Sequence, residues 1–383
     1  MRWIVALRSR LGPYAQILLI FLASRLMLTV IGVLTLANFG DPSTQVHWFN
    51  WENIANLYAR WDSNWYLSII ENGYSRIEVA EQSGATNFAF FPFYPLLVIA
   101  VQHLLGISSI TAGVLVSNLA FIAALLLIFE YAQVIGFSRR VGIMTVLLLC
   151  FVPQGFIFSA LYTESTFLLL LVAAMYALRH QFYLVSGLCA ALLSATRANG
   201  VFFMVFAAIW LLRQHGLRSL LYPWRHPEPL LPIALAPLGL VIFWWFCFLT
   251  TGDAFAQAST AWHGWGWQAD LPWRNLADHL SSTNPNARFW ATSSLVAFVL
   301  SFLLLRLKLY EEFAFCLSIM LLYWSGVLPN SLLRYSIVLF PVFIGISSAL
   351  EEHPLLLWLW LSLCSLLNGF LMTAWTASRE ISI

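Results

Sequence analysis

Residues 60–66 read RWDSNWY and residues 69–74 read IIENGY, which places ionisable side chains among aromatic ones after the first long apolar run. The surrounding chain of 383 residues is 61% hydrophobic and only 9% charged. Soluble proteins carry about 25% charged residues, so the composition excludes an ordinary soluble domain. We therefore predict an all-α polytopic membrane protein, whose functional groups lie where charge meets the apolar phase.

Apolar runs bounded by charged residues, proline or glycine predict about eleven membrane helices, which form one domain over residues 1–383. Four of the middle runs are shorter than the about 20 residues that a span needs. Short helices are tolerated where a protein encloses its own cavity, so we expect residues 141–213 to line one. The expected helices cover roughly 14–37, 110–135, 141–158, 164–179, 183–196, 199–213, 231–250, 291–306, 312–329, 335–350 and 355–376.

Lysine and arginine residues indicate which loops face the cytoplasm. Eleven of them fall on one side of the membrane and seven on the other, where the loops are far longer. Because cytoplasmic loops are enriched in these residues, the N-terminus is expected to be cytoplasmic. The larger group comprises Arg2, Arg8, Arg10, Arg139, Arg140, Arg179, Arg213, Arg218, Arg225, Arg306 and Lys308, and the smaller one Arg60, Arg76, Arg197, Arg274, Arg288, Arg334 and Arg379.

Two long loops then face the outside, at about 38–109 and about 251–290. The first carries the RWDSNWY motif and continues into residues 88–105, which are apolar enough to cross a membrane. A crossing there would move every later basic loop to the outside, so we interpret this segment as a helix in the outer interface. The second loop is rich in tryptophan, which is typical of a membrane interface or of sugar stacking.

Asp62 is the candidate with the clearest chemistry. A carboxylate between Trp61 and Ser63 at the membrane edge is suited to accept a proton from a hydroxyl group. Arg60 and Arg76 are the nearest cations in the sequence. The alternative is an ordinary solvated loop acid, and the residue pattern alone leaves both interpretations open.

Three later outer turns carry further charged residues. Glu164, in SALYTES at 159–165, begins a predicted helix, where an acid either caps the helix or positions a hydroxyl group. Arg197, in TRANG at 196–200, and Arg334, in LRY at 333–335, lie at expected membrane edges. An arginine there is costly unless it is paired, and its planar fork suits a phosphate. A structural salt bridge is the alternative for each arginine.

Other kinds of active site lack support in the sequence. There is no GxxxxGK[ST] loop, no HExxH pair and no Asp-x-Asp clamp, so nucleotide-driven transport, zincin chemistry and nucleotide-sugar donors have no motif. The five cysteines lie in apolar stretches without a CxxC pair. We expect neither a metal site nor a cofactor, while a metal requirement stays open.

Five motifs in one order resemble a known family. They are RWDSxWYxxIxxxGY at 60–74, FAFFPFYP at 88–95, SALYTES at 159–165, TRANG at 196–200 and LLRYSIVLFP at 332–341. Together they span about 280 residues and resemble the PIG-V family. These are the GPI mannosyltransferase 2-like proteins, which belong to the GT-C membrane glycosyltransferases.

The resemblance implies a GT-C-type fold and an inverting transfer of a sugar, typically mannose, on the outer or luminal face. The donor would be a polyprenyl-phosphate sugar, and the acceptor a lipid or glycan. Asp62 maps onto the catalytic base. The donor phosphate would be held by Arg334, Arg197 and Arg60, and the acceptor or sugar by Glu164, Tyr162, Trp61, Trp65, Tyr74 and Asn199.

Two other readings compete with the transferase. A transporter or flippase of lipid-linked sugars would use the same cavity without bond formation, and would more often show inverted repeats, which are not evident here. A noncatalytic scaffold would leave Asp62 dispensable.

Membrane lipid is an expected partner in each case, and nucleic acid is not. The membrane would be the plasma membrane in a prokaryote and the endoplasmic reticulum in a eukaryote, and without GPI in the source the acceptor would be another molecule.

Overall fold

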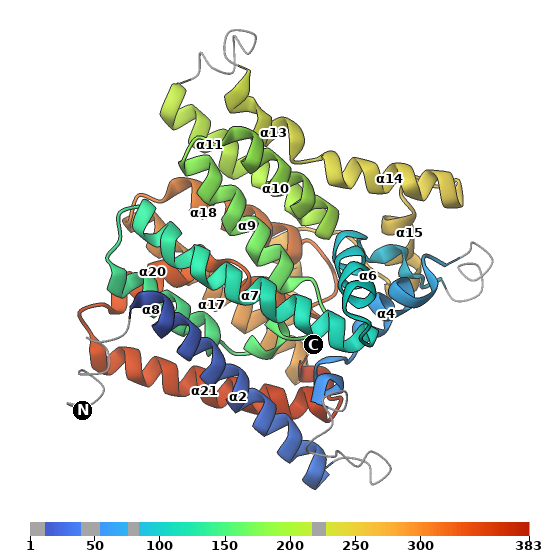
Figure 1. The fold of residues 1–383 in the computed structure, drawn as a ribbon, viewed down its shortest axis with the longest axis horizontal. Helices are drawn as coiled ribbons and strands as arrows, with labels where there is room; N and C mark the ends of the chain where they lie inside the picture. The colour runs from blue at the N-terminus through green and yellow to red at the C-terminus, as the bar shows by residue number, and fades with distance from the viewer. Residues whose placement is uncertain (1–11, 40–53, 76–83, 217–226, 383) are drawn as a thin grey trace.

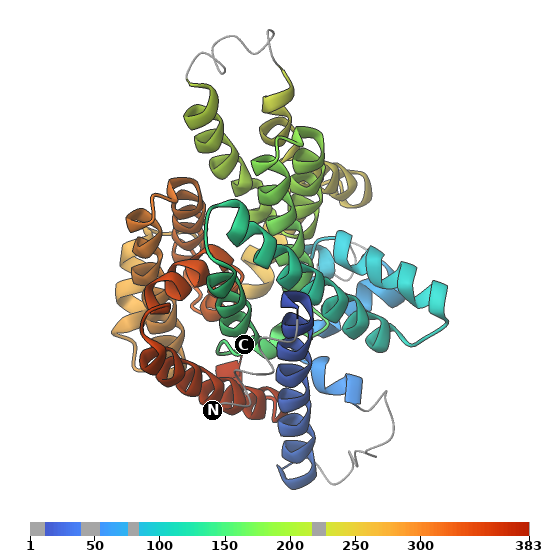
Figure 2. The same ribbon diagram turned by 60° about the vertical axis from the view of Figure 1, so that its left-hand side comes forward.

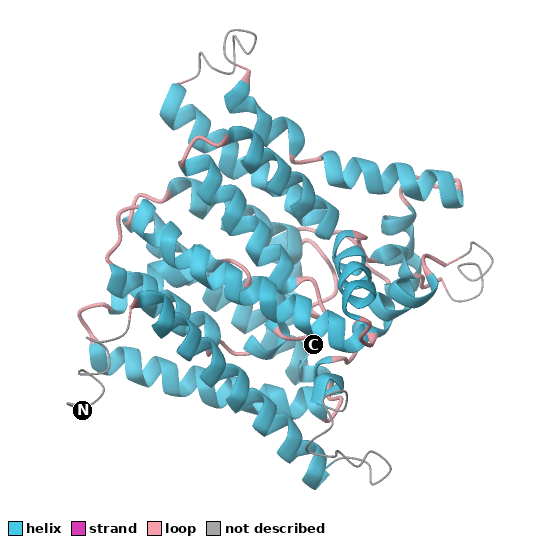
Figure 3. Ribbon diagram, viewed as in Figure 1, coloured by secondary structure: helices cyan, strands magenta, loops and turns pink. Residues whose placement is uncertain are grey.

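The computed structural model describes residues 12–39, 54–75, 84–216 and 227–382. The described part is helical and contains no strand (Figure 3), only one isolated bridge between Ala269 and Gly326. The expected all-α class is therefore confirmed. The α-helices are α2 Pro13–Phe39, α4 Ser63–Asn72, α6 Phe93–Leu105, α7 Ser109–Val134, α8 Arg139–Cys150, α9 Glu164–Arg179, α10 Tyr183–Thr196, α11 Phe203–His215, α13 Leu231–Leu235, α14 Leu238–Thr251, α15 Ala256–Trp265, α16 Pro272–Leu280, α17 Pro285–Arg306, α18 Tyr310–Trp324, α19 Leu332–Ile337, α20 Phe340–Leu350 and α21 Pro354–Thr376.

Short 3₁₀-helices complete the described part: η1 Asn56–Tyr58, η2 Asn87–Ala89, η3 Gly155–Phe158, η4 Ala198–Phe202, η5 Glu228–Leu230 and η6 Glu380–Ser382. Five helical segments of the described part are long and apolar enough to cross a membrane: 13–39, 109–134, 228–251, 285–306 and 354–376. The shorter apolar helices α6, α10 and α20 have 13, 14 and 11 residues. The number of crossings stays a prediction.

Several expected helices are interrupted near one end. The expected helix 141–158 ends at Cys150 and is followed by the irregular stretch that holds η3, because Pro153 cannot continue a helix. The expected helix 335–350 is two helices, α19 and α20, and Pro341 lies in the first turn of α20. Residues 199–213 likewise begin as η4. Each interruption frees backbone for an irregular turn beside the site described below.

The first long loop has the expected bounds, since α2 ends at residue 39 and α7 begins at residue 109. It holds α4 and α6, and α6 is too short for the about 20 residues of a span. Its position in an outer interface stays a prediction. The second loop is shorter than expected because α17 begins at Pro285, and it contains α15 and α16.

Helices α7, α9 and α10 lie side by side, and α9 packs between the other two (Figure 1). Twelve of the 16 residues of α9 are buried. Gly113 of α7 faces Leu161, and a Cβ at this glycine would come within 2.6 Å of the Leu161 Cγ atom. The missing side chain therefore lets α7 approach the turn before α9, which fixes that turn in place.

A buried arginine joins α2 to the corner between α8 and α9. The Arg25 guanidinium donates hydrogen bonds to the carbonyl oxygens of Gly155 at 2.9 Å and Cys150 at 3.1 Å. It also donates to the Ser159 hydroxyl at 3.0 Å. Arg25 is thus a structural donor rather than a snorkelling side chain. Figure 2 shows α21 meeting α2 at an angle on the same side of the molecule.

Replacing Arg25 with leucine is expected to lower the thermal unfolding midpoint of the purified protein in detergent. The change leaves the carbonyl oxygens of Cys150 and Gly155 buried without their donor, at a cost of about 1–3 kcal/mol each. Leu18→Ala on the exposed face of the same helix is the control and should move the midpoint little. An unchanged midpoint for the Arg25 variant would contradict the assigned role.

The predicted sidedness rests partly on residues outside the described ranges. Arg2, Arg8 and Arg10 precede the described chain, and Arg76, Arg218 and Arg225 lie in its gaps. A cytoplasmic N-terminus therefore stays a prediction.

Candidate active site

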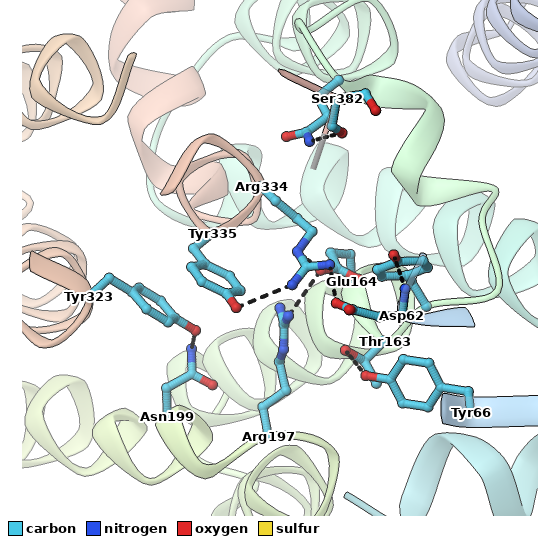
Figure 4. Close-up of polar contacts among 12 residues, drawn as sticks. Asp62, Tyr66, Thr163, Glu164, Arg197, Asn199, Tyr323, Arg334, Tyr335 and Ser382 are labelled. Carbon is cyan, nitrogen blue, oxygen red and sulfur yellow. Dashed lines mark hydrogen bonds and ion pairs between the residues drawn. The ribbon is translucent and has the colours of Figure 1, made fainter. Parts of the chain in front are cut away.

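Four charged side chains from distant parts of the chain meet in one cluster (Figure 4). The Arg334 Nη1 atom lies 2.9 Å from the Asp62 Oδ2 atom. The Nε atom of the same arginine lies 3.2 Å from the Glu164 Oε1 atom. The Arg197 Nη2 atom lies 3.0 Å from that same Glu164 oxygen. Two acids and two arginines thus form a charge-balanced chain of contacts, which we call the ion-pair cluster.

Each member of the ion-pair cluster is placed at an end or in a break of a helix. Asp62 is the residue before α4, and Glu164 is the first residue of α9. Arg197 follows the last residue of α10, and Arg334 lies in the short helix α19. Glu164 at the N-terminus of α9 also meets the positive end of the helix dipole. The charged side chains therefore lie at helix ends inside the molecule, and the apolar parts of the helices pack around them.

The backbone beside Asp62 is held in an unusual conformation. Trp61 has a φ of 54°, which is the left-handed region that non-glycine residues seldom adopt. The Asp62 backbone N–H donates to the Tyr162 hydroxyl at 2.9 Å, and this hydroxyl donates to the Arg60 carbonyl oxygen at 3.2 Å. Tyr162 therefore clamps the chain on both sides of Trp61 and sets the direction of Asp62.

Burial differs sharply within the ion-pair cluster. The Glu164 side chain is 0% exposed and that of Arg334 is 5% exposed, whereas that of Asp62 is 28% exposed. Buried charges are tolerated when they are paired and hydrogen-bonded. Among the described residues, the second Asp62 oxygen, Oδ1, has no hydrogen bond. Asp62 is consequently the acid of the cluster that a substrate can reach.

Tyrosine rings form one wall of the ion-pair cluster. The Tyr335 ring lies 4.9 Å from the Arg197 guanidinium and 5.1 Å from that of Arg334, and its hydroxyl accepts from Arg334 at 3.2 Å. Tyr323 stacks on Tyr335 with ring centroids 3.9 Å apart. Asn199, a predicted sugar ligand, donates to the Tyr323 hydroxyl at 2.6 Å. Sequence reasoning missed Tyr323 as a site residue, because a tyrosine inside an apolar helix reads as packing.

Arg60 and Trp61 directly precede Asp62 in the chain, and their side chains carry polar atoms without described partners. Within the described ranges, the buried Arg60 Nε, Trp61 Nε1 and Ser63 Oγ atoms have no hydrogen-bond partner. Burial lowers the pKa of the Arg60 guanidinium from its ordinary value. An approaching anion would satisfy these donors.

Trp65 and Tyr74 lie in aromatic packing instead. Trp65 contacts Trp265 with ring centroids 5.3 Å apart, and Tyr74 stacks on Phe88 at 5.0 Å. The Tyr74 hydroxyl donates to the Phe90 carbonyl oxygen. The structure therefore does not bring these two residues into the ion-pair cluster, and their sugar-binding roles stay predictions.

Within the described part of the chain, no group of three His, Cys, Asp or Glu residues lies close enough together to hold a metal ion. The chemistry available at the ion-pair cluster is proton transfer at a carboxylate and binding of an anion by arginine.

The family model described as Mannosyltransferase (PIG-V) matches residues 4–243. The chain belongs to this family. Among curated PIG-V relatives, GPI alpha-1,6-mannosyltransferase 2 of Mus musculus is 31% identical over 159 residues, which are 39% of this chain and 31% of the mouse protein. The enzyme of Rattus norvegicus is 31% identical over 152 residues, covering 37% of this chain and 29% of the rat protein. The matches thus span less than a third of these relatives.

A solved structure shares the fold of this PIG-V family member. ArnT from Cupriavidus metallidurans, solved with undecaprenyl phosphate bound, superposes with a TM-score of 0.52 at 12% identity. The match covers 86% of this chain and 59% of ArnT. The likeness confirms the predicted GT-C-type fold. The fold and the five long apolar helices of the described part together identify the chain as an integral membrane protein.

Proposed function

We propose that the chain is an inverting glycosyltransferase that moves a sugar, mannose by family, from a polyprenyl-phosphate donor to a hydroxyl group of a lipid-linked or membrane-associated acceptor. The observation that carries this proposal is the ion-pair cluster, in which Asp62 is positioned by Arg334 and is the accessible acid. Membership of the mannosyltransferase family supports the sugar. In this proposal residues 1–383 form one membrane domain.

In the proposed reaction the acceptor hydroxyl oxygen attacks the anomeric carbon of the donor sugar. A glycosidic bond forms as the bond between that carbon and the phosphate oxygen breaks. The Asp62 Oδ1 atom takes the hydroxyl proton, and the leaving lipid phosphate keeps the bonding electrons. Attack opposite the phosphate inverts the anomeric centre. A phosphate is already a good leaving group, so the scheme needs no general acid.

Arginines of the site would stabilise the phosphate. Arg334 and Arg197 both contact one oxygen of Glu164, which holds the two guanidinium groups in place. Their remaining N–H groups are then available to bind an anion. The Nη1 atom of Arg197 has no hydrogen-bond partner among the described residues. Arg60 adds a guanidinium that is not paired with a described acid. These three residues form the proposed donor-phosphate site.

The other predicted ligands divide by position. Trp61 and Asn199 keep polar atoms, Nε1 and Oδ1, without described partners and are the better candidates for hydroxyl groups of the sugar or acceptor. Glu164 orients the arginines, and Tyr162 orients Asp62. Trp65 and Tyr74 would act from the aromatic packing nearby. We place the reaction on the outer or luminal face, with the N-terminus in the cytoplasm.

Incubation of the purified protein in lipid with labelled polyprenyl-phosphate mannose and membrane-associated acceptors tests this proposal. We expect a labelled glycolipid and release of the polyprenyl phosphate, with the anomeric configuration opposite to that of the donor. NMR of the product measures that configuration. Transport of intact donor across the bilayer without a new glycosidic bond would instead support the flippase reading, and retention of configuration would contradict the direct displacement.

A further inference from the structure

A groove separate from the ion-pair cluster lies between α2 and α7, and η1 closes its inner end. Its volume is about 390 Å³. Most of its surface comes from apolar side chains, including Leu22 and Leu26 of α2, Ala55 before η1, and Val114 and Leu115 of α7. Ligand pockets in proteins span about 300–1,000 Å³, so this groove suits one slender group rather than a bulky head group.

The mouth of the groove faces the expected hydrocarbon of the bilayer. Leu22 and Leu26 are 50% and 66% exposed, and they lie on the longest helix that could cross a membrane. An apolar chain can therefore enter sideways from the membrane without crossing water. Figure 1 shows α2 at the edge of the molecule and α7 nearer its centre.

The inner end of the groove is polar but internally satisfied. The Thr29 hydroxyl and the Tyr58 hydroxyl lie 2.9 Å apart and share a hydrogen bond. The Ser159 hydroxyl donates to the Asn118 Oδ1 atom at 2.8 Å and accepts from Arg25, which also lines the groove, at 3.0 Å. These groups mark the point where an apolar chain would end and a more polar part of the same molecule would begin.

The same two chain segments build the groove and the surroundings of Asp62. The Leu161 N–H donates to the Tyr58 carbonyl oxygen at 3.0 Å, and four residues further along the Asp62 N–H donates to the Tyr162 hydroxyl. The groove thus adjoins the side of the site that carries Asp62. The arginines of the ion-pair cluster come from other elements, α10 and α19.

We propose that this groove holds one hydrocarbon chain of the acceptor lipid, so that the head group of the same lipid reaches Asp62. The assignment rests on the proposed function, in which Asp62 takes the proton of the acceptor hydroxyl and the arginines hold the donor phosphate. A groove on the Asp62 side therefore belongs to the acceptor rather than to the polyprenyl chain of the donor. The residues that line the groove take no part in the transfer reaction itself.

Photo-crosslinking tests the site without relying on catalysis. The probe is hexadecyl mannoside with a diazirine near the end of its chain, added to the full protein in lipid vesicles. We expect label on the peptides that contain residues 22–26 and 114–118, and most of it should be lost in Leu115→Trp and Leu26→Trp, which fill the groove from its two walls. Val134→Trp, at an exposed position near the other end of α7, is the control and should keep the label.

Competition distinguishes the possible occupants. Excess undecaprenyl phosphate should leave the label in place, and displacement by it would assign the groove to the donor chain and overturn the proposal. Equal labelling of the exposed faces of α2 and α21 would reduce the groove to an ordinary bilayer contact and also overturn it. Unfolding midpoints of the tryptophan variants close to wild type confirm that the loss of label is local.

Kinetics adds a second arm that separates this proposal from the proposed function. For Leu115→Trp we expect the KM for hexadecyl mannoside to rise about tenfold because the head group loses its alignment. The KM for methyl mannoside, which has no long chain, and the KM for the donor should be unchanged. A rise in the donor KM instead would contradict the acceptor assignment. Failure of the wild-type protein to transfer any sugar would count against the proposed function alone, since the cross-linking result does not depend on turnover.

Discussion

Asp62→Asn is expected to reduce sugar transfer by at least about a hundredfold, because a positioned general base contributes about 10²–10⁴-fold to a rate. Asparagine has the shape of aspartate and can still accept a hydrogen bond from Arg334 through its amide oxygen. It cannot take a proton from the attacking hydroxyl group. The measurement is the initial rate of transfer from labelled polyprenyl-phosphate mannose by the purified variant in lipid vesicles.

The matched control for this variant is Asp270→Asn. Asp270 also forms an ion pair with an arginine, Arg274, at 3.7 Å, but on an exposed part of the second long loop. It should retain wild-type activity. Full activity of the Asp62 variant would reject the base assignment. Because Arg334 keeps its contact with Glu164, the unfolding midpoint of Asp62→Asn should stay close to wild type.

Arg334→Lys is expected to raise the donor KM more than the acceptor KM and to lower turnover by about 10²-fold, as loss of one preorganised donor does at other sites of developing charge. Lysine keeps the positive charge but lacks the planar fork. It cannot reach Asp62, Glu164 and the Tyr335 hydroxyl together, as Arg334 does. Steady-state kinetics with donor and acceptor varied separately measures both constants.

Arg334→Ala extends this test to stability. It leaves the buried Glu164 with Arg197 alone and removes the only described cation paired with Asp62, and breaking a buried pair costs about 3–5 kcal/mol. We expect a clearly lower unfolding midpoint together with lost transfer. Arg274→Ala, at an exposed arginine, should leave both unchanged. A normal donor KM and normal turnover in Arg334→Lys would remove this arginine from the phosphate site.

The sequence predicted long apolar helices well and their interruptions poorly. Hydropathy located α2, α7 and α21 within one or two residues, because a membrane span is defined by its length and its lack of charge. It ran one expected helix through residues 338 and 339, where α19 and α20 separate. Such a break depends on tertiary contacts, and its residues are as apolar as those of the helices around it.

The charged members of the site were all selected from the sequence, whereas their partners were not. Motif order singled out Asp62, Glu164, Arg197 and Arg334, since few residues of such a chain are charged. A salt bridge and a phosphate ligand stood as alternatives for Arg334. The structure shows the salt bridge, made across 272 residues to Asp62, and leaves the phosphate as a proposal. Sequence spacing holds no information about a contact that folding alone creates.

The left-handed Trp61 has a consequence for how this protein can evolve. A residue held in that region costs about 1–3 kcal/mol, and glycine would remove the cost. One stabilising substitution therefore adjoins Asp62, the residue that would contact the substrate. Glycine would also loosen the backbone that Tyr162 grips on either side. We therefore expect stabilising substitutions in heat-adapted homologues at other positions, because glycine at position 61 would stabilise the fold but loosen the orientation of Asp62.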